Sequence, residues 1–218
     1  MNKLKVWDII EIREDYKLIG MTWGFKIKKN HLNEVTKYNA RLCAQGFAQT
    51  LGIDVHKTYA PTGRLNSLRT LIAFASHSNL KFHQINIKSA FLNVPLSETV
   101  YLASPQGLDI DKRKYCLQLK KAIYGLKQAP LAWYNRLKEW LNKYQFHMCK
   151  LDPCVFYRLG KHLLWLYIHI DDIALFGNKV SQGLLWKQEG LALRNQELTW
   201  RAPKGDKKYY GIYFLSRK

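Results

Sequence analysis

The sequence predicts an α+β fold, in which antiparallel strands are combined with a few helices instead of alternating with them one by one. Two apolar runs, Leu163–Ile170 and Ile173–Phe176, are separated only by Asp171 and Asp172, a pattern typical of a strand, a tight turn and a second strand. The segment Ala129–Tyr144 has helical periodicity. No regular strand–helix–strand repeat surrounds these elements, so a doubly wound parallel sheet is not expected.

The N-terminal part of the chain is expected to be mostly extended. Val6–Ile12 and Gly20–Lys28 contain apolar and aromatic residues in the alternation typical of strands. Asn30–Asn33 is expected to form a turn, and Tyr38–Phe47 is expected to be a further extended segment.

A first helix is expected to run to about Ser78, with Asn66 or Ser67 as its cap. One face of this helix would then carry four apolar residues: Leu68, Leu71, Ile72 and Ala75. Lys81–Ile87 is predicted to be a buried strand that is followed by a short helical stretch.

The helix predicted at Ala129–Tyr144 starts with Pro130 in its first turn, where a missing N–H costs nothing. A stripe of large apolar residues follows the helical period, and such a stripe favours a core position over a ligand site: Trp133, Tyr134, Leu137, Trp140, Leu141 and Tyr144. After Gly177 the pattern weakens, and we expect a helix at Trp186–Leu193 and a strand at Tyr209–Leu215.

Composition and charge indicate a folded protein that attracts polyanions. The 218 residues are 47% hydrophobic and 13% aromatic, which excludes a disordered tail. Lys and Arg number 35 against 16 Asp and Glu, for a net charge of +19, and nucleic acid is the commonest intracellular polyanion. Charge alone also fits a generally basic, solvated surface. No apolar run is long enough to span a bilayer and no secretory signal is recognised, so an intracellular location is expected, in a cytoplasmic particle or the nucleus.

The four cysteines do not form a recognisable metal-binding pattern. They contain no CxxC pair, and the spacing of His147, Cys149 and Cys154 matches no common zinc motif. We expect reduced thiols.

Asp171 and Asp172 are the residues most open to a chemical interpretation. Adjacent carboxylates at the end of an apolar hairpin repel each other, and a divalent cation such as Mg²⁺ relieves that repulsion through oxygen ligands. The competing explanation is that Asp is simply a good residue for a solvated turn. The pair alone does not decide between the two.

Several short strings around this pair resemble, in order and spacing, the copia-type retrotransposon reverse transcriptases. The strings are Tyr38-Asn39-Ala40-Arg41-Leu42 with Gln45-Gly46-Phe47, Gly52-Ile53-Asp54, Tyr59-Ala60-Pro61, Gln84–Asn93, Ile123–Pro130 with Ala132-Trp133-Tyr134, Leu151-Asp152-Pro153 and His169-Ile170-Asp171-Asp172. Each string is weak evidence alone, but together they cover residues 7–178. Tyr210-Gly211-Ile212 is faintly similar to a later strand of the family.

The resemblance implies a polymerase palm, an antiparallel sheet backed by helices, with a fingers subdomain but without a full thumb. We expect residues 1–178 to form the fingers and palm, and residues 179–218 a diverged extension of the palm. The implied reaction is two-metal nucleotidyl transfer with Mg²⁺ or Mn²⁺, an RNA template, a DNA primer and a deoxynucleoside triphosphate. No membrane partner is expected, whereas further domains of a Pol polyprotein are.

The resemblance also assigns roles to individual residues. Asp171 and Asp172 match the acid pair that binds the metals. Arg41, Tyr124, Gly125 and Lys127 match residues at or beside the incoming nucleotide, where a guanidinium group suits a triphosphate. Outside the family context, Lys127 would be an ordinary surface lysine and Tyr124 a core aromatic residue.

The chain departs from the family at positions that matter for chemistry. Asn86 stands where the family has its first catalytic Asp, and a neutral amide cannot bridge two metals as a carboxylate does. His169 replaces the usual Tyr. This change either disturbs the position of the primer or nucleotide, or leaves a half-buried histidine whose hydrogen bonds are satisfied. In the fingers, Asn39 and Gln45 replace lysines. Three hypotheses follow: an impaired polymerase, a nucleic-acid-binding module without catalysis, or a remnant that folds poorly.

Overall fold

The structure is a computed structural model that describes residues 4–160, 163–178 and 193–195. The chain divides into two compact units, each described here by itself. The first contains residues 1–60 and 89–136, and the second contains residues 61–88 and 137–218. Mixed helix and sheet content, with few helices and several sheets, agrees with the predicted α+β class. The assignment of residues 1–178 to a single fingers-and-palm region stays a prediction.

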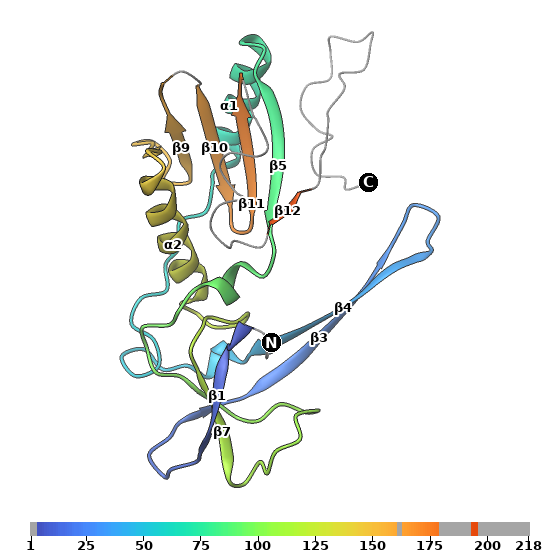
Figure 1. The fold of residues 1–218 in the computed structure, drawn as a ribbon, viewed down its shortest axis with the longest axis vertical. Coiled ribbons are helices and arrows are strands. Elements are labelled where there is room, and N and C mark those ends of the chain that lie inside the picture. Colours follow the sequence, from blue (N-terminus) through green and yellow to red (C-terminus); the bar gives the residue numbers. More distant parts are fainter. Residues whose placement is uncertain (1–3, 161–162, 179–192, 196–218) are drawn as a thin grey trace. The chain divides into compact units, whose positions relative to one another are not determined.

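The first unit contains a small sheet and a long two-stranded ribbon (Figure 1). The sheet has the order β1-β7-β6-β2, made of Trp7–Glu11, Tyr115–Leu119, Tyr101–Leu102 and Leu18–Ile19. Its strands pair antiparallel except β2 and β6, which are parallel. The core under the sheet is fully buried and aliphatic, and it includes Ile19, Leu102, Leu117 and Ile123.

The ribbon pairs β3, Met21–Lys29, with β4, Val35–Ala44, in an antiparallel ladder. Asn30 closes the turn between the strands: its side-chain oxygen accepts hydrogen bonds from the backbone N–H groups of Leu32 and Glu34. After β4 the chain forms a short 3₁₀ turn, η2, at Gly46–Ala48, so the extended segment ends earlier than the predicted Phe47. A second 3₁₀ turn, η3, at Ala90–Asn93 is the short helical stretch expected after Ile87.

The second unit is built on an antiparallel sheet of six strands in the order β12-β5-β11-β10-β9-β8. These strands are Leu193–Asn195, Lys81–Ile87, Asp172–Gly177, Leu164–His169, Val155–Arg158 and His147–Met148. The predicted hairpin is confirmed in β10 and β11. Of the helix expected at Trp186–Leu193, only Leu193 lies in the described residues, where it begins a strand, and Tyr209–Leu215 lies outside them.

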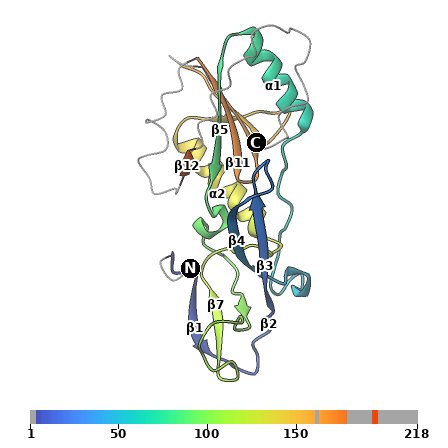
Figure 2. The same ribbon diagram turned by 90° about the vertical axis from the view of Figure 1, so that its right-hand side faces the viewer.

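Helix α1, Leu65–His77, packs on this sheet through its predicted apolar face (Figure 2). Leu71 and Ala75 are buried against Val155, Tyr167 and Phe176. Gly63, just before the helix, is needed for this approach, because a Cβ there would lie 2.6 Å from the Tyr167 ring. The sequence periodicity thus located the core of this unit correctly.

The predicted cap of α1 is wrong, because Arg64 is the N-cap residue and no side chain of the helix itself caps it. Asp152, distant in sequence and 2% exposed, accepts hydrogen bonds from the Arg64 backbone N–H at 3.1 Å and from Ser67 Oγ at 2.6 Å. It also accepts one from the Cys154 N–H at 2.9 Å. Burial alone raises the pKa of Asp152, but these hydrogen bonds outweigh it, and the pKa is lowered.

Helix α2, Ala129–Lys143, agrees with the prediction within one residue, and the division between the units falls within it. Its periodic apolar side chains are buried, as expected of a core stripe: Trp133, Tyr134, Leu137, Trp140 and Leu141. None of the helices in the described part of the chain has the length and apolar character that crossing a membrane requires.

Candidate active site and nucleotide-facing loop

The acidic pair lies at the end of the β10–β11 hairpin. His169 and Asp172 are the last paired residues, so Ile170 and Asp171 make the turn. Ile168 and Ile173, which lead into and out of the turn, are buried, whereas Asp171 and Asp172 are half-buried. The buried residues on both sides of the turn therefore anchor the hairpin in the sheet, while the carboxylates of Asp171 and Asp172 stay partly accessible. His169 is exposed, so its interpretation as a half-buried histidine is wrong.

Ile170 has a φ of 58°, in the left-handed region. A β-branched side chain is rarely found there, because its Cβ substituents clash with the backbone. A two-residue hairpin often requires this conformation and usually places Gly or Asn in it. The turn that presents the two acids is therefore strained at the residue before them.

Asn86 lies directly beside the acidic pair, as the expected antiparallel sheet required. Strand β5 pairs with β11 so that Asn86 faces Asp172, and the Ile87 N–H donates to the Asp171 backbone oxygen at 2.8 Å. The Asn86 amide Nδ2 donates to Asp172 Oδ1 at 2.9 Å. The structure therefore places Asn86, the position of the missing catalytic acid, next to Asp171 and Asp172, the two residues predicted to bind metal.

This donor set fits a divalent cation only in part. Carboxylate oxygens of Asp171 and Asp172 are the hard ligands that Mg²⁺ prefers. The third position supplies a neutral amide whose N–H already occupies one acceptor site of Asp172. Within the described residues, no cluster of three or more His, Cys, Asp or Glu side chains is found. The local negative charge is thus limited to two carboxylates.

The residues predicted to face the nucleotide lie in the first unit, on β4 and on the loop before α2. The Arg41 guanidinium carbon lies 5.2 Å from the centre of the Tyr124 ring, a cation–π contact. Phe91 packs edge-on against the same ring at 4.8 Å. Arg41 is exposed, so its N–H groups can reach an anion while the ring fixes its plane.

Gly125 allows the loop to approach β4 closely. It has a φ of 92°, and a Cβ there would lie 2.0 Å from the Ala44 backbone oxygen. The Ala44 N–H donates to the Tyr124 backbone oxygen at 2.8 Å, which ties the loop to the strand. Any side chain at residue 125 would therefore move Tyr124 away from Arg41.

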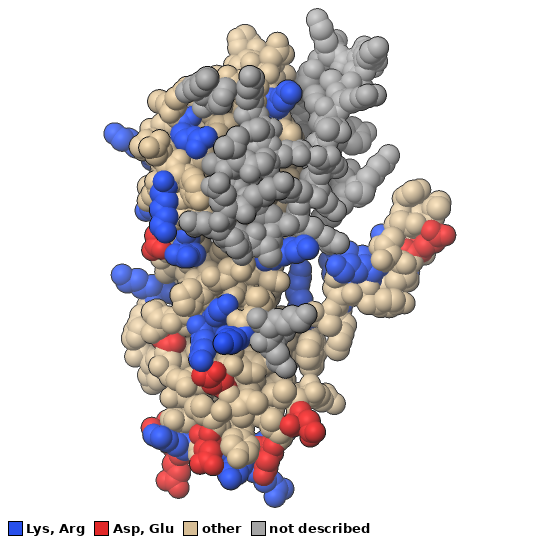
Figure 3. Space-filling model, in the orientation of Figure 1, with Lys and Arg blue, Asp and Glu red and all other residues tan. Residues whose placement is uncertain are grey.

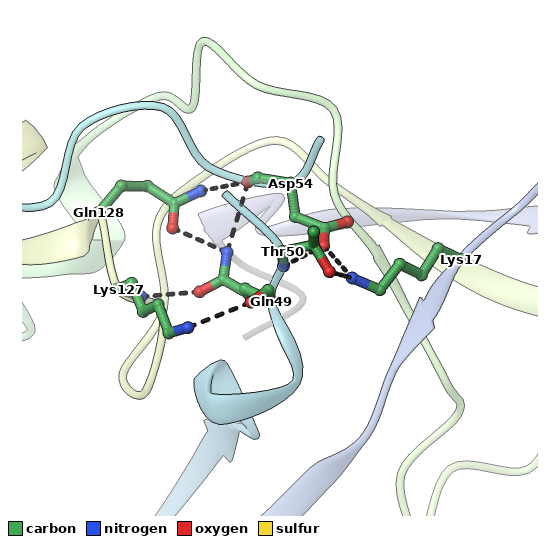
Figure 4. A network of polar contacts seen from close by, with 6 residues as sticks. All are labelled: Lys17, Gln49, Thr50, Asp54, Lys127 and Gln128. Atoms are coloured by element: carbon green, nitrogen blue, oxygen red, sulfur yellow. Dashed lines mark hydrogen bonds and ion pairs between the residues drawn. The ribbon is translucent and has the colours of Figure 1, made fainter. Parts of the chain in front are cut away.

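Lys127 is engaged within the protein. Its backbone N–H donates to Gln49 Oε1 at 2.8 Å, and its Nζ donates to the Gln49 backbone oxygen at 3.1 Å (Figure 4). A contact with nucleotide stays a prediction. Lys127 is exposed, but its ammonium group already has a hydrogen-bond partner within the protein. Its first role in the structure is to hold the loop against the segment after β4.

Lys127 belongs to a buried polar network that sequence reasoning missed. Gln49 Nε2 donates to Gln128 Oε1 at 2.9 Å, and Gln128 Nε2 donates to the Asp54 backbone oxygen at 3.1 Å. The Asp54 carboxylate accepts from the Thr50 N–H at 2.8 Å and from the Lys17 ammonium. Gln49, Asp54 and Gln128 are all at most 5% exposed. Asp54 and Gln128 stood in the family-like strings, but nothing in the sequence showed that they meet.

The cysteines, all in the described part of the chain, are free thiols. Burial raises the pKa of the Cys154 thiol to about 12, so this sulfur stays protonated at neutral pH.

Comparison with known proteins shows the family of the chain. The family model described as reverse transcriptase (RNA-dependent DNA polymerase) matches residues 4–192, so the chain belongs to the reverse transcriptase family. Within that family it is of the copia type. The Pol polyprotein of transposon TNT 1-94 from Nicotiana tabacum is 30% identical over 193 residues, which are 87% of this chain and 14% of the polyprotein.

Two further relatives come from other organisms. The Pol polyprotein of transposon RE1 from Arabidopsis thaliana is 33% identical over 79% of this chain and 12% of its own length. The Ty1-DR4 Gag-Pol polyprotein from Saccharomyces cerevisiae is 25% identical over 82% of the chain and 11% of its own length. The chain thus spans only a small part of the polyproteins that it matches.

Proposed function

We propose that this chain carries the centre of an RNA-directed DNA polymerase that is impaired by Asn86. The observation that supports the proposal is the pairing of Asn86 with Asp172 beside Asp171 at the β10–β11 turn. Asn86 and Asp172 meet there across β5 and β11, and Asp171 is the turn residue before Asp172. By resemblance, this is the position where the family has its metal-binding acids. We further propose that nucleic acid and other domains of a Pol polyprotein are its partners.

In this proposal, Asp171 and Asp172 would hold Mg²⁺ or Mn²⁺. A bound cation would supply Lewis-acid activation of the primer 3′-hydroxyl and positive charge for the departing pyrophosphate. Arg41 binds the phosphates of the incoming deoxynucleoside triphosphate through its guanidinium fork. Tyr124 orients that guanidinium group, and Gly125 lets the loop lie close enough to do so.

Impairment follows from the charge at residue 86. A carboxylate there would complete a set of three negative groups, whereas the amide adds none and donates a hydrogen bond into the site. Transition-state charge in phosphoryl transfer is stabilised mainly by electrostatics, so weaker metal binding lowers the rate directly.

Primer extension on an RNA template, with Mg²⁺ and separately with Mn²⁺, tests the proposal. We expect little product from the native chain and more from Asn86→Asp, because the third carboxylate is restored. Asn86→Ala, which removes the amide without adding charge, is the matched control and should yield no gain. Polymerase chemistry is ruled out for this chain if Asn86→Asp, verified as folded, yields no product with either metal.

A second candidate is a nucleic-acid-binding module without catalysis. The net charge of +19 and the amide in the acidic site support it. Binding to an RNA–DNA hybrid across a salt series tests it, because each phosphate contact releases counterions and steepens the salt dependence. A flat dependence of log K on log salt would exclude this function.

A further inference from the structure

The loop before α2 is fixed to the segment after β4 by two glutamines. Gln49 follows η2 and Gln128 precedes α2, and both are at most 4% exposed. Gln49 Nε2 donates to Gln128 Oε1 at 2.9 Å, and Gln49 Oε1 accepts from the Lys127 backbone N–H at 2.8 Å. One amide therefore uses its donor and its acceptor on two successive residues of the loop. Because both directions are used, the loop is fixed along its length and not only in its distance from Gln49.

The two glutamines are anchored in turn by Asp54, which is 5% exposed. The Asp54 backbone oxygen accepts from Gln128 Nε2 at 3.1 Å and from Gln49 Nε2 at 3.4 Å. Its carboxylate accepts from the Thr50 N–H at 2.8 Å and pairs with the Lys17 ammonium (Figure 4). The amide pair thus rests on a backbone oxygen whose own residue is held in place by an ion pair.

Stability alone does not explain a buried pair of amides. The net gain from a buried hydrogen bond is small, and replacing both partners by apolar groups of the same shape is often nearly neutral. An amide pair adds direction, because each donor must meet an acceptor and only one arrangement satisfies all of them. Such a pair is useful where a neighbouring side chain must be placed accurately, and the loop before α2 carries one at Tyr124.

The contact between Tyr124 and Arg41 depends on where this loop lies. Tyr124 is half-buried and Arg41 is exposed, so burial alone does not hold the guanidinium carbon at 5.2 Å from the ring centre. The backbone brings the two segments together, because the Ala44 N–H donates to the Tyr124 backbone oxygen at 2.8 Å. The segments also touch at two glycines, since a Cβ at Gly46 would lie 2.0 Å from the Gly125 backbone oxygen. A shift of the loop would therefore move the ring away from the guanidinium group.

The charges around Arg41 make the orientation of its guanidinium group important. Lys26, Lys28 and Lys37 lie on the same face of the β3–β4 ribbon as Arg41, and Figure 3 shows basic groups along the ribbon. Ammonium groups attract any polyanion as point charges, whereas a guanidinium fork binds phosphate oxygens in a fixed plane. The plane of Arg41 therefore distinguishes specific binding of a triphosphate from general attraction.

We infer that Gln49 and Gln128 are positioning residues, which hold Tyr124 against Arg41 and so set the guanidinium plane for a triphosphate. Both glutamines are buried, so their influence on the ligand passes through Tyr124. The identity of the ligand rests on the proposed function, whereas the placement of Tyr124 does not. The device needs no metal and no chemistry at Asp171 and Asp172.

NMR of the chain in chelator, without ligand, measures the positioning directly. The Tyr124 ring should shift the Arg41 δ-methylene protons upfield, and the difference between the native chain and Tyr124→Leu defines the full shift. Gln128→Met keeps a similar volume but removes both hydrogen bonds of the amide, and it should lose most of that shift. Leu117→Val is the matched control, because it trims the fully buried core of the same unit and should keep the shift.

Calorimetric titration with dTTP, also in chelator, measures the consequence for the ligand. Gln128→Met should weaken dTTP binding roughly two- to tenfold, the effect of losing the pre-organisation of one long side chain, and Leu117→Val should not. In a Tyr124→Leu background, Gln128→Met should have no further effect on dTTP binding, because its influence passes through that ring. A merely structural role would weaken binding equally in both backgrounds.

The inference is overturned if Gln128→Met, verified as folded by a cooperative thermal transition, keeps the Arg41 shift, or if Leu117→Val loses as much of it. Equal weakening of dTTP binding with and without the Tyr124 ring would also overturn it. If Gln128→Met does not fold, the double variant Gln49→Met with Gln128→Met replaces the amide pair by an apolar pair and takes its place. A native chain that binds no dTTP would contradict the proposed function instead, and the Arg41 shift would still decide the role of the glutamines.

Discussion

The substitution Asn86→Asp should destabilise the folded chain in the absence of a divalent cation. The native amide donates to Asp172 Oδ1 at 2.9 Å, and the variant places a second carboxylate at that distance. Losing a hydrogen bond to a charged group costs about 1.5–3 kcal/mol. Two negative charges at about 4 Å repel by roughly 4 kcal/mol at the effective dielectric of a protein surface.

These contributions do not simply add, because the pair of carboxyls can take up a proton. For a carboxyl with an ordinary pKa near 4, protonation at pH 7 costs about 4 kcal/mol, which sets an upper limit on the penalty. Both side chains are half-buried, so solvent lowers it further. We expect a loss of about 3 kcal/mol at pH 7, or roughly 6–12 °C in Tm. The loss should shrink as the pH falls towards 5.

Thermal unfolding with chelator and with Mg²⁺ measures this prediction. A cation at 100 times its Kd returns about 2.7 kcal/mol, so Mg²⁺ should restore most of the Tm of Asn86→Asp. Asn86→Ala should lose only the hydrogen bond, and its stability should respond to Mg²⁺ and to pH no more strongly than that of the native chain. The reasoning is refuted if Asn86→Asp is as stable as the native chain in chelator, or if Mg²⁺ stabilises both equally.

Three further experiments test the surrounding structure. Asp54→Asn should lower the free energy of unfolding by about 1–3 kcal/mol, and a double-mutant cycle with Lys17→Ala should show coupling; additive effects would argue against the ion pair. The lowered pKa of Asp152 contributes stability that is complete above about pH 4 and lost as pH falls through the folded value, so urea unfolding of Asp152→Asn should show a flatter acid limb than the native chain. Ile170→Gly should raise the free energy of unfolding by about 1 kcal/mol, since relieved strain exceeds the added chain entropy; a decrease in urea denaturation would contradict it.

The elements with strong periodicity were predictable from the sequence. Helix α2 and the β10–β11 hairpin fall within a residue or so of their expected bounds, because a long apolar stripe and two buried runs allow few alternatives. The cap of α1 was not predictable. Asn66 and Ser67 satisfied the local rule, but Asp152 reaches the helix from a distant segment, and tertiary contacts of that kind leave no local signal.

The residues of the candidate site were easier to predict from the sequence than the contacts that they make. The resemblance named Asn86, Asp171 and Asp172, and strand pairing places them together. It also named Lys127 as a residue facing the nucleotide, whereas the structure shows its ammonium donating to the backbone at Gln49. A motif shared with a family identifies a position in the fold. The hydrogen-bond partner of a long side chain at that position depends on segments far away in the sequence.

The hydrogen bond from Asn86 explains how an acidic turn can persist on a strained hairpin. In a site with three carboxylates, a cation supplies the positive charge that offsets their repulsion. Here the amide N–H supplies a smaller positive charge directly to Asp172, and one negative charge is removed altogether. In the proposed site, the folded state would depend less on metal, and for the same reason it would hold metal less strongly. Under the proposed function, an amide in place of the acid stabilises the paired ends of β5 and β11 and weakens catalysis through the same change in electrostatics.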